Sequence, residues 1–333
     1  MAEAGAGVGP LRLVSDIGAT NARFALADGK CALRLERSYR CAEFPGLTDA
    51  VRRYFDDTAL APAERPREAA LAIAAPLHGD LISATNLNWT FSAAATRREL
   101  GLQQLLLLND FTALALSLRA LTAAGKVQVG GGKPRPQTPI ALLGPGSGLG
   151  VSGLLQGGRR WYPIMGEGGH ATLPASTPRE AAVLQYLRQE YAHVSAERVL
   201  SGPGLYQLYQ TLCALDGVSR TAGNVEAVTD HALAGSEPHC VEAVRMFCEF
   251  LGTAASDLTL TLGAHGGCYI GGGIVPRLMP IFPRSGFRPR FEDKGRFRAY
   301  LEPIPVYVIT AGNAALTGCA RAFSQPAPRI VAA

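Results

Sequence analysis

The chain has 333 residues, of which 47% are hydrophobic and 18% are charged. This composition excludes an intrinsically disordered protein, and the length favours two compact parts over one core. The formal net charge of +5 is mild and suits either an anionic or a neutral ligand. Six basic residues lie between Arg284 and Arg298, but Glu292 and Asp293 interrupt them and no aromatic ladder accompanies them. We therefore expect a solvated loop there and no nucleic-acid partner.

Seven cysteines are scattered along the chain without any CxxC pair. An odd number at irregular spacing argues against a disulfide framework, and the lack of a cluster argues against a structural zinc site. The first ten residues lack the basic and apolar regions of a signal peptide, and the apolar stretches 105–108 and 111–118 are too short to span a bilayer. We therefore expect a cytoplasmic protein with reduced thiols and no membrane partner.

The first third of the chain begins with a predicted β-hairpin. A buried strand over 11–15 ends at Asp16, a turn-rich segment covers 17–21, and a second strand follows over 23–27. Apolar periodicity and capping residues then predict helices over 44–55, 92–100 (capped by Ser92) and 111–121, and strands over 69–75 and 105–108. Asn109 and Asp110 therefore fall at the carboxyl end of a strand, where open α/β sheets bind ligands.

The remainder of the chain contains a second strand, glycine turn and strand. Residues 125–139 read as a loop, and strands are expected over 140–143 and 151–155, on either side of the glycine-rich segment 144–150. Further helices are predicted from 177, over 240–262 and over 313–323, and further strands over 268–270 and 305–309. Because the same pattern occurs near 11–26 and near 140–155, two related α/β lobes would explain it.

The two glycine turns are candidate phosphate sites, although neither a P-loop nor a Rossmann fingerprint is present. Glycine turns between strands expose backbone N–H groups that can cradle phosphate oxygens. Asp16 could hold a hydrated Mg²⁺ at the first turn, while Thr20 and Asn21 donate to phosphate. The alternative is two plain hairpins, which we favour slightly for the second turn taken alone; the pair together favours a nucleotide.

Several polar residues elsewhere have both a structural and a functional interpretation. Asn109 and Asp110 could simply cap the following helix. Glu167 and His170 lie among glycines, which let the backbone approach a ligand closely. Glu197 could pair with Arg198 or cap a turn, and the sequence does not decide its role.

Seven blocks of sequence carry a resemblance to a known family. They are 16–23 (DIGATNAR), 109–113 (NDFTA), 144–150 (GPGSGLG), 166–170 (GEGGH), 193–202 (HVSAERVLSG), 270–276 (IGGGIVP) and 291–297 (FEDKGRF). In this order they resemble bacterial glucokinases, of the group distinct from the zinc-containing sugar kinases. The resemblance extends from about Leu11 to Arg321. Ala19 stands where a second glycine is usual, and Ser147 stands where threonine is common.

The resemblance implies an α/β protein with the two-lobed fold of actin-like and hexokinase-like ATPases and a cleft between the lobes. The small lobe would comprise 11–120 and 311–330, and the large lobe 121–310. The last helix would return to pack on the small lobe. Homodimers are common in the family, so a homodimer is expected.

The implied activity is ATP-dependent phosphorylation of D-glucose at its 6-hydroxyl, the first step of glycolysis, giving glucose 6-phosphate and ADP with Mg²⁺ as cofactor. Asp110 would be the catalytic base. The implied glucose ligands are Asn109, Asp110, Glu167, His170 and Glu197. The first phosphate loop would use Asp16 (to Mg²⁺ through water), Gly18, Thr20 and Asn21; the second would use Gly146, Ser147 and Gly148; and Gly271, Gly272 and Gly273 would lie near the nucleoside.

Two rival functions share much of this pattern. A kinase for fructose, mannose or N-acetylmannosamine would use the same loops and base, so the residues do not separate it from a glucose kinase. A sugar-sensing repressor would carry a helix-turn-helix module before the first loop. Only fifteen residues precede Asp16, which is too few for that module, so we expect no DNA binding.

Overall fold

The computed structural model describes residues 10–75, 77, 79–85, 87–324 and 330–331. The chain divides into two compact units, and each is described by itself. Unit 1 comprises Met1–Leu121, Gly157–Ile164 and Ala311–Ala333, and unit 2 comprises Thr122–Gln156 and Met165–Thr310. The small lobe expected from the sequence, 11–120 and 311–330, does not include residues 157–164, which belong to unit 1.

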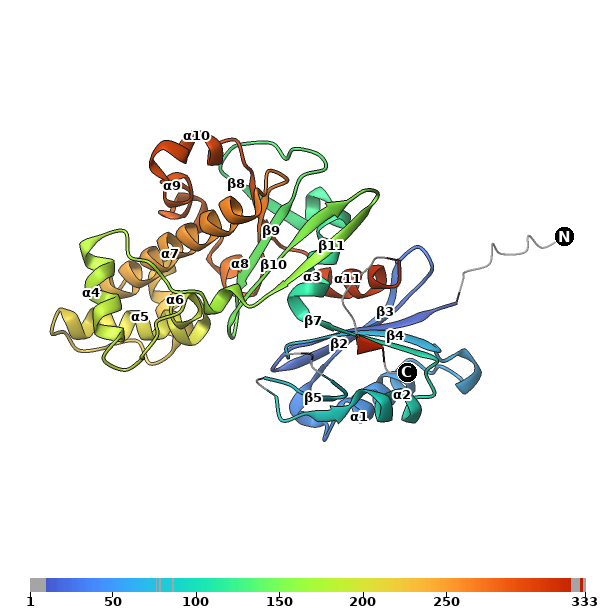
Figure 1. Cartoon of the computed structure of the whole chain (residues 1–333). Helices are drawn as coiled ribbons and strands as arrows, with labels where there is room; N and C mark the ends of the chain where they lie inside the picture. The colour runs from blue at the N-terminus through green and yellow to red at the C-terminus, as the bar shows by residue number, and fades with distance from the viewer. Residues whose placement is uncertain (1–9, 76, 78, 86, 325–329, 332–333) are drawn as a thin grey trace. The chain divides into compact units, whose positions relative to one another are not determined.

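Unit 1 is built on a six-stranded sheet with the order β14-β7-β4-β1-β2-β3 (Figure 1). The central strands β1, β4 and β7 are parallel, and the outer strands pair antiparallel. The strands are β1 (Arg12–Ile17), β2 (Asn21–Ala27), β3 (Leu33–Arg40), β4 (Glu68–Ile73), β7 (Gln104–Asn109) and β14 (Ile330–Val331), and a separate small sheet pairs β5 (Leu81–Ser83) with β6 (Thr90–Ser92).

Helices cover both faces of this sheet (Figure 1). Because side chains alternate along a strand, Leu13 packs with the residues of α1 (Leu47–Asp57) and α2 (Ala93–Glu99), whereas Val14 packs with those of α3 (Asp110–Ser117) and α11 (Ala314–Ala322). Helix α2 begins where the sequence predicts, with the Ser92 hydroxyl accepting the Ala95 N–H at 3.0 Å. Helix α1 begins three residues later than predicted because Phe44, which precedes a proline, is extended.

Unit 2 repeats this arrangement with a second six-stranded sheet, β11-β10-β9-β12-β13-β8. Its strands are β8 (Lys126–Val129), β9 (Ile140–Pro145), β10 (Leu149–Gly157), β11 (Arg160–Gly166), β12 (Cys268–Ile270) and β13 (Val306–Ile309). As in unit 1, an antiparallel meander lies on one side of three parallel strands. The repeated strand–turn–strand pattern therefore does correspond to two sheets of related topology. Strand β8 contradicts the expectation of a continuous loop over 125–139.

The helices of unit 2 are α4 (Pro178–Leu187), α5 (Gly202–Leu215), α6 (Val225–Ala234), α7 (Pro238–Leu262), α8 (Ile274–Leu278), α9 (Phe287–Glu292) and α10 (Arg298–Leu301). The long helix α7 packs against β9 and against α5, α6 and α9 (Figure 1). The predicted start of α4 is confirmed by a capping box between Thr177 and Glu180. Helix α7 ends at Leu262 and is capped by Gly263, whose φ of 58° is the left-handed conformation that terminates many helices. Within the described parts of the chain, no helix has the length and apolar character needed to cross a membrane.

Gly318 allows α11 to lie directly on α3, and its replacement is expected to destabilise unit 1. A Cβ atom at this position would overlap the backbone carbonyl of Ala113. Helix propensity alone predicts that Gly318→Ala stabilises the protein by about 1 kcal/mol. We expect a loss of about 1–3 kcal/mol instead, because the helices must move apart. Chemical denaturation decides the sign, and Gly312→Ala is the matched control because its Cβ would meet nothing within 4 Å.

Candidate active site

The first glycine turn joins β1 to β2 in unit 1. The Gly18 N–H donates to the Asn21 carbonyl at 3.0 Å, and the Cys41 N–H donates to the Thr20 carbonyl at 2.9 Å. Asp16 lies opposite Arg23 in the hairpin register. Burial raises the pKa of Asp16, and the positive charge of Arg23 partly opposes this effect. The part of the chain that is described offers the Asp16 carboxylate no hydrogen bond, which leaves its oxygens available to the water shell of a metal ion.

Asn109 and Asp110 lie at the carboxyl end of β7, at the same edge of the sheet as Asp16. The register aligns Ile17 with Ile73 and Ile73 with Asn109, so the carboxyl ends of β1, β4 and β7 lie side by side. Because β4 alone separates β1 from β7, the backbones that carry Asp16 and Asp110 at this edge lie about 10 Å apart, which is two strand spacings.

The structure separates the roles of these two neighbouring residues. Asn109 is the N-cap of α3, and its Oδ1 accepts the N–H groups of Phe111 at 2.9 Å and Thr112 at 3.3 Å. Asp110 is the first residue of the helix, and its Oδ1 accepts the Phe111 N–H at 2.9 Å. The N-cap position therefore belongs to Asn109, whose amide Nδ2 could still donate to a ligand.

Glu167 and His170 begin and end a glycine turn that follows β11 in unit 2. Gly168–His170 form a 3-10 turn, and both Glu167 and His170 are exposed. A Cβ atom on Gly169 would overlap the Leu149 carbonyl, so glycine is required for this turn to pack on β10.

Glu197 lies in a neighbouring 3-10 turn, Ala196–Arg198. The two turns are joined because the Ala196 N–H donates to the Ala171 carbonyl at 2.8 Å. Glu197 Oε1 lies 4.0 Å from His170 Nδ1, and its Oε2 accepts the Leu149 N–H at 2.8 Å. Arg198 stacks over the Tyr191 ring at 4.2 Å, so the expected alternative of a Glu197–Arg198 pair is not formed.

The second glycine turn and the triple-glycine segment meet at the carboxyl ends of β9 and β12. The Gly146 N–H donates to the Gly148 carbonyl, and the Gly202 N–H at the start of α5 donates to the Gly146 carbonyl, both at 2.8 Å. Gly271 donates to the Leu143 carbonyl at 2.8 Å, and Gly272 has a φ of 78° and packs on Pro145. Ser147 and Gly273 are exposed.

Three glycines in these segments are not explained by the fold. A Cβ atom on Gly146 or Gly273 would meet nothing within 4 Å, and one on Gly18 would meet nothing closer than 3.7 Å. None of the three has a positive φ. The lack of a side chain at these positions leaves space beside the backbone, which suits the close approach of a nucleotide phosphate chain. One partly buried carboxylate, Asp16, suits Mg²⁺ that retains most of its waters. The described residues contain no group of three or more His, Cys, Asp or Glu side chains that could hold a metal ion.

Unit 2 thus brings together the second turn, the triple-glycine segment, Glu197 and His170, with Glu167 at the start of the same turn as His170. Unit 1 brings together the first turn, Asp16, Asn109 and Asp110. Sequence reasoning missed two contributors: Arg23, which acts on Asp16, and Leu149, whose N–H holds Glu197. The hairpin register could have identified Arg23. No local signal points to Leu149, because Glu197 lies 48 residues away.

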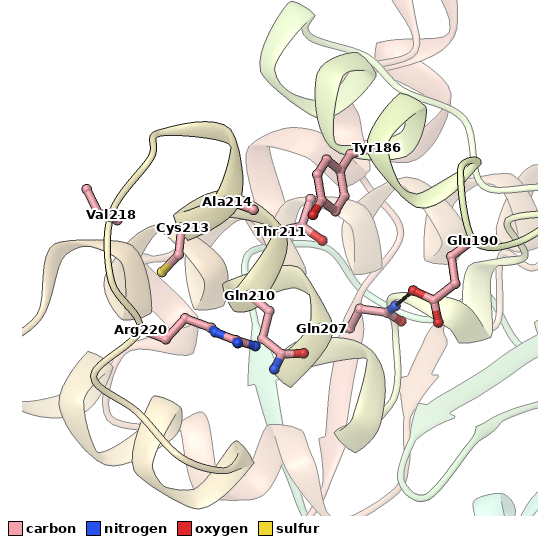
Figure 2. Close-up of a pocket in the computed structure, with 9 residues that line it drawn as sticks. All are labelled: Tyr186, Glu190, Gln207, Gln210, Thr211, Cys213, Ala214, Val218 and Arg220. Atoms are coloured by element: carbon pink, nitrogen blue, oxygen red, sulfur yellow. Dashed lines mark hydrogen bonds between the residues drawn. The ribbon is translucent and has the colours of Figure 1, made fainter.

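A separate pocket of about 290 Å³ lies between α4 and α5 in unit 2 (Figure 2). Tyr186 lines it from the end of α4 and Glu190 from the turn that follows, and the Gln207 amide donates to Glu190 at 3.0 Å. No residue that the sequence predicts for the sugar or the nucleotide lines this pocket. The candidate site therefore rests on the turns at the strand ends.

The two sheets of common topology, each with a glycine turn beside its parallel strands, have the arrangement of the actin-like ATPase fold. A family model described as Glucokinase matches residues 13–326. The chain belongs to the glucokinase family.

Known relatives agree with this assignment. The chain is 49% identical to the glucokinase of Chromobacterium violaceum over 324 residues, which is 95% of this chain and 92% of that protein. It is also 49% identical over 316 residues to a protein of Paraburkholderia xenovorans named Bifunctional protein glk. That match covers 94% of this chain but 49% of the relative, so the chain spans about half the length of this and similar bifunctional relatives.

Solved structures show the same fold. A glucokinase from an Antarctic psychrotroph matches with a TM-score of 0.83 and 35% identity, over 93% of this chain and 98% of that one. A glucokinase of the ROK family from Streptomyces griseus, solved with glucose and AMPPNP, matches with a TM-score of 0.62 and 17% identity, over 93% of this chain and 98% of that one. At this low identity the second match supports the fold alone.

Proposed function

We propose that the protein phosphorylates D-glucose at the 6-hydroxyl with ATP, giving glucose 6-phosphate and ADP. One observation carries the proposal: in unit 2 the polar residues suited to a sugar meet the second glycine turn. Glu197 lies 4.0 Å from His170 and accepts the N–H of Leu149, the residue after Gly148, at 2.8 Å. Membership of the glucokinase family supports it independently.

The polar set has the chemistry that glucose requires. Glucose is neutral and presents hydroxyl groups that both donate and accept. The carboxylates of Glu167 and Glu197 accept hydrogen bonds, while the Asn109 amide and the His170 ring can donate them. These side chains, together with Asp110, would bind and orient the sugar.

Asp110 is proposed as the general base. A primary hydroxyl is a weak nucleophile until its proton has an acceptor. A carboxylate within hydrogen-bond reach would orient the 6-oxygen for in-line attack on the terminal phosphorus and take up the proton as the new bond forms. Exclusion of water from the sugar would suppress hydrolysis of ATP.

The nucleotide is assigned to the glycine segments. The first turn would use Gly18, Thr20 and Asn21, and the second Gly146, Ser147 and Gly148. The Thr20 and Ser147 hydroxyls would donate to phosphate oxygens, while Gly18 and Gly146, whose N–H groups donate within the turns, would leave space for the phosphates. Gly271, Gly272 and Gly273 would lie near the nucleoside. Mg²⁺, when bound with ATP, would neutralise the charge on the phosphates. Asp16 would orient the water shell of that ion.

A product assay with several hexoses tests the proposed function. Purified protein with MgATP is expected to convert glucose faster than fructose, mannose or N-acetylmannosamine, with the new phosphate on the 6-oxygen. Phosphorus NMR of the product identifies the position. Much faster turnover of one of the other sugars would reject glucose as the substrate, and a parallel assay with polyphosphate tests the donor.

Replacing Asp16 with alanine is expected to impair the nucleotide side of the reaction selectively. Loss of a carboxylate that orients metal-bound water typically weakens metal-dependent steps by about 10- to 100-fold. The KM for MgATP should rise by this order, while the glucose Kd from calorimetry stays nearly unchanged. An equal loss of glucose affinity would mean that Asp16 has a structural role.

The cellular context belongs to the same proposal. All seven cysteines are free, which suits a reducing, cytoplasmic compartment. The family resemblance further implies a homodimer, which size-exclusion chromatography with light scattering would test.

A further inference from the structure

The Glu197 carboxylate contacts two candidate subsites at once. Its Oε2 accepts the N–H of Leu149, the first residue of β10 after the second glycine turn, at 2.8 Å. Its Oε1 lies 4.0 Å from Nδ1 of His170, on the side of the sugar turns. The side chain is about one-third exposed, so one oxygen is committed to the protein and the other remains accessible.

The backbone around Glu197 fixes where this carboxylate lies. The Ser201 hydroxyl donates to the Glu197 carbonyl at 2.9 Å, and the Ala196 N–H donates to the Ala171 carbonyl at 2.8 Å. The neighbouring Arg198 does not compete for it, because its guanidinium stacks on Tyr191. The carboxylate is therefore held between the two subsites by its own turn.

Gly148 and Gly146 differ in what they accommodate, although both belong to the same turn. A Cβ atom on Gly148 would lie 2.5 Å from Glu197 Oε2, whereas a Cβ atom on Gly146 would meet nothing within 4 Å. Neither glycine has a positive φ. Gly148 thus makes room for the carboxylate of Glu197, and Gly146 leaves its space open.

We propose that Glu197 is a positioning residue that couples the sugar turns to the second phosphate loop, so that glucose and nucleotide change each other's affinity. The proposal rests on the proposed function for the identity of the two ligands. A glucose hydroxyl that donates to Oε1 would restrict the carboxylate to the orientation in which Oε2 accepts the Leu149 N–H. A loop ordered by nucleotide would in turn hold the carboxylate ready for sugar. Linkage requires the two effects to be equal in free energy.

Two substitutions of glycine by alanine test the coupling from the loop side. Gly148→Ala is expected to displace the flexible Glu197 carboxylate and to weaken glucose binding, measured by calorimetry without nucleotide, by about 5- to 150-fold, the usual range of coupling between sites. Gly146→Ala should leave the glucose Kd within about twofold of the wild-type value, although it lies in the same turn. Equal glucose affinities of the two folded variants would overturn the proposal.

Substitutions at the other end test it with nucleotide alone. Glu197→Ala is expected to weaken binding of AMPPNP with Mg²⁺, in the absence of sugar, by a similar factor, whereas His170→Ala should not change it. Glu197→Gln provides the rescue, because its amide oxygen can still accept the Leu149 N–H. It should restore nucleotide binding but not glucose binding, a split that general loss of structure would not produce.

This second experiment also separates the coupling from the proposed function. If wild-type protein phosphorylates no glucose, the proposed function fails, and the nucleotide affinities of Glu197→Ala and His170→Ala still decide whether Glu197 positions the loop. Equal affinities of these two variants for the nucleotide overturn the coupling. Thermal denaturation of every variant identifies any that has lost its fold. If Glu197→Ala is lost, the comparison of Gly148→Ala with Gly146→Ala decides, and equal glucose affinities of these two variants overturn the coupling.

Discussion

Asp110→Asn is expected to lower kcat for glucose phosphorylation by about 10²- to 10⁴-fold, the usual contribution of a general base. Asparagine keeps the size of the side chain and an oxygen that can accept the Phe111 N–H, but it cannot take up a proton at neutral pH. Glucose affinity should fall much less, because the other proposed ligands remain. Stopped assays for kcat and calorimetry for the glucose Kd measure the two effects on one preparation.

The structure supplies a control for this variant that the sequence could not. Asn109, which accepts two N–H groups at the start of α3, is the helix cap. Asn109→Ala should therefore cost about 0.5–2 kcal/mol of stability, whereas Asp110→Asn should leave the denaturation midpoint close to the wild-type value. A folded Asp110→Asn protein with nearly normal kcat would end the assignment of Asp110 as base.

Arg290→Met is expected to destabilise the protein by about 3–5 kcal/mol, because it leaves a buried carboxylate without its cation. Arg290 Nη1 lies 2.8 Å from Oε1 of Glu180, whose side chain is completely buried. The second oxygen of Glu180 accepts the N–H groups of Ser176 at 2.6 Å and Thr177 at 3.1 Å. The ion pair thereby joins α9 to the capping box of α4. Urea denaturation followed by circular dichroism measures the change.

Two further variants identify burial as the cause. Arg277→Met removes an exposed pair, in which Arg277 lies 2.8 Å from Asp230, and should cost less than about 1 kcal/mol. Adding Glu180→Gln to Arg290→Met should recover part of the loss, since the neutral amide needs no cation. If Arg290→Met costs no more than Arg277→Met, the buried pair does not stabilise the fold in this way.

Features that depend on neighbouring residues could be predicted from the sequence. The hairpin around Asp16, the Ser92 cap and the capping box of Thr177 and Glu180 all involve residues a few positions apart, so local spacing is sufficient. The same holds for the strand that delivers Asn109 and Asp110 to a sheet edge. The ordered sequence blocks then indicated the family, which the family model confirms.

Edge strands were missed for a physical reason. Strand β3 is exposed at nearly every position, so it has no alternation of apolar and polar residues to reveal it. Strand β8 has four residues and lies in a segment rich in glycine and proline. Both exist because a neighbouring strand, β2 or β13, offers unpaired backbone groups, and that neighbour is defined only in the folded chain.

The sequence by itself determined the local elements, the family and the residue types of the candidate site. Only the tertiary structure decided which of those residues touch. Gly146 and Gly148 are equivalent in the sequence, yet one faces open space and the other faces a carboxylate from a turn about fifty residues away. Long-range contacts of this kind arise when strands and turns pack, and their partners leave no periodic pattern along the chain, so the role of Glu197 between two subsites appears only in three dimensions.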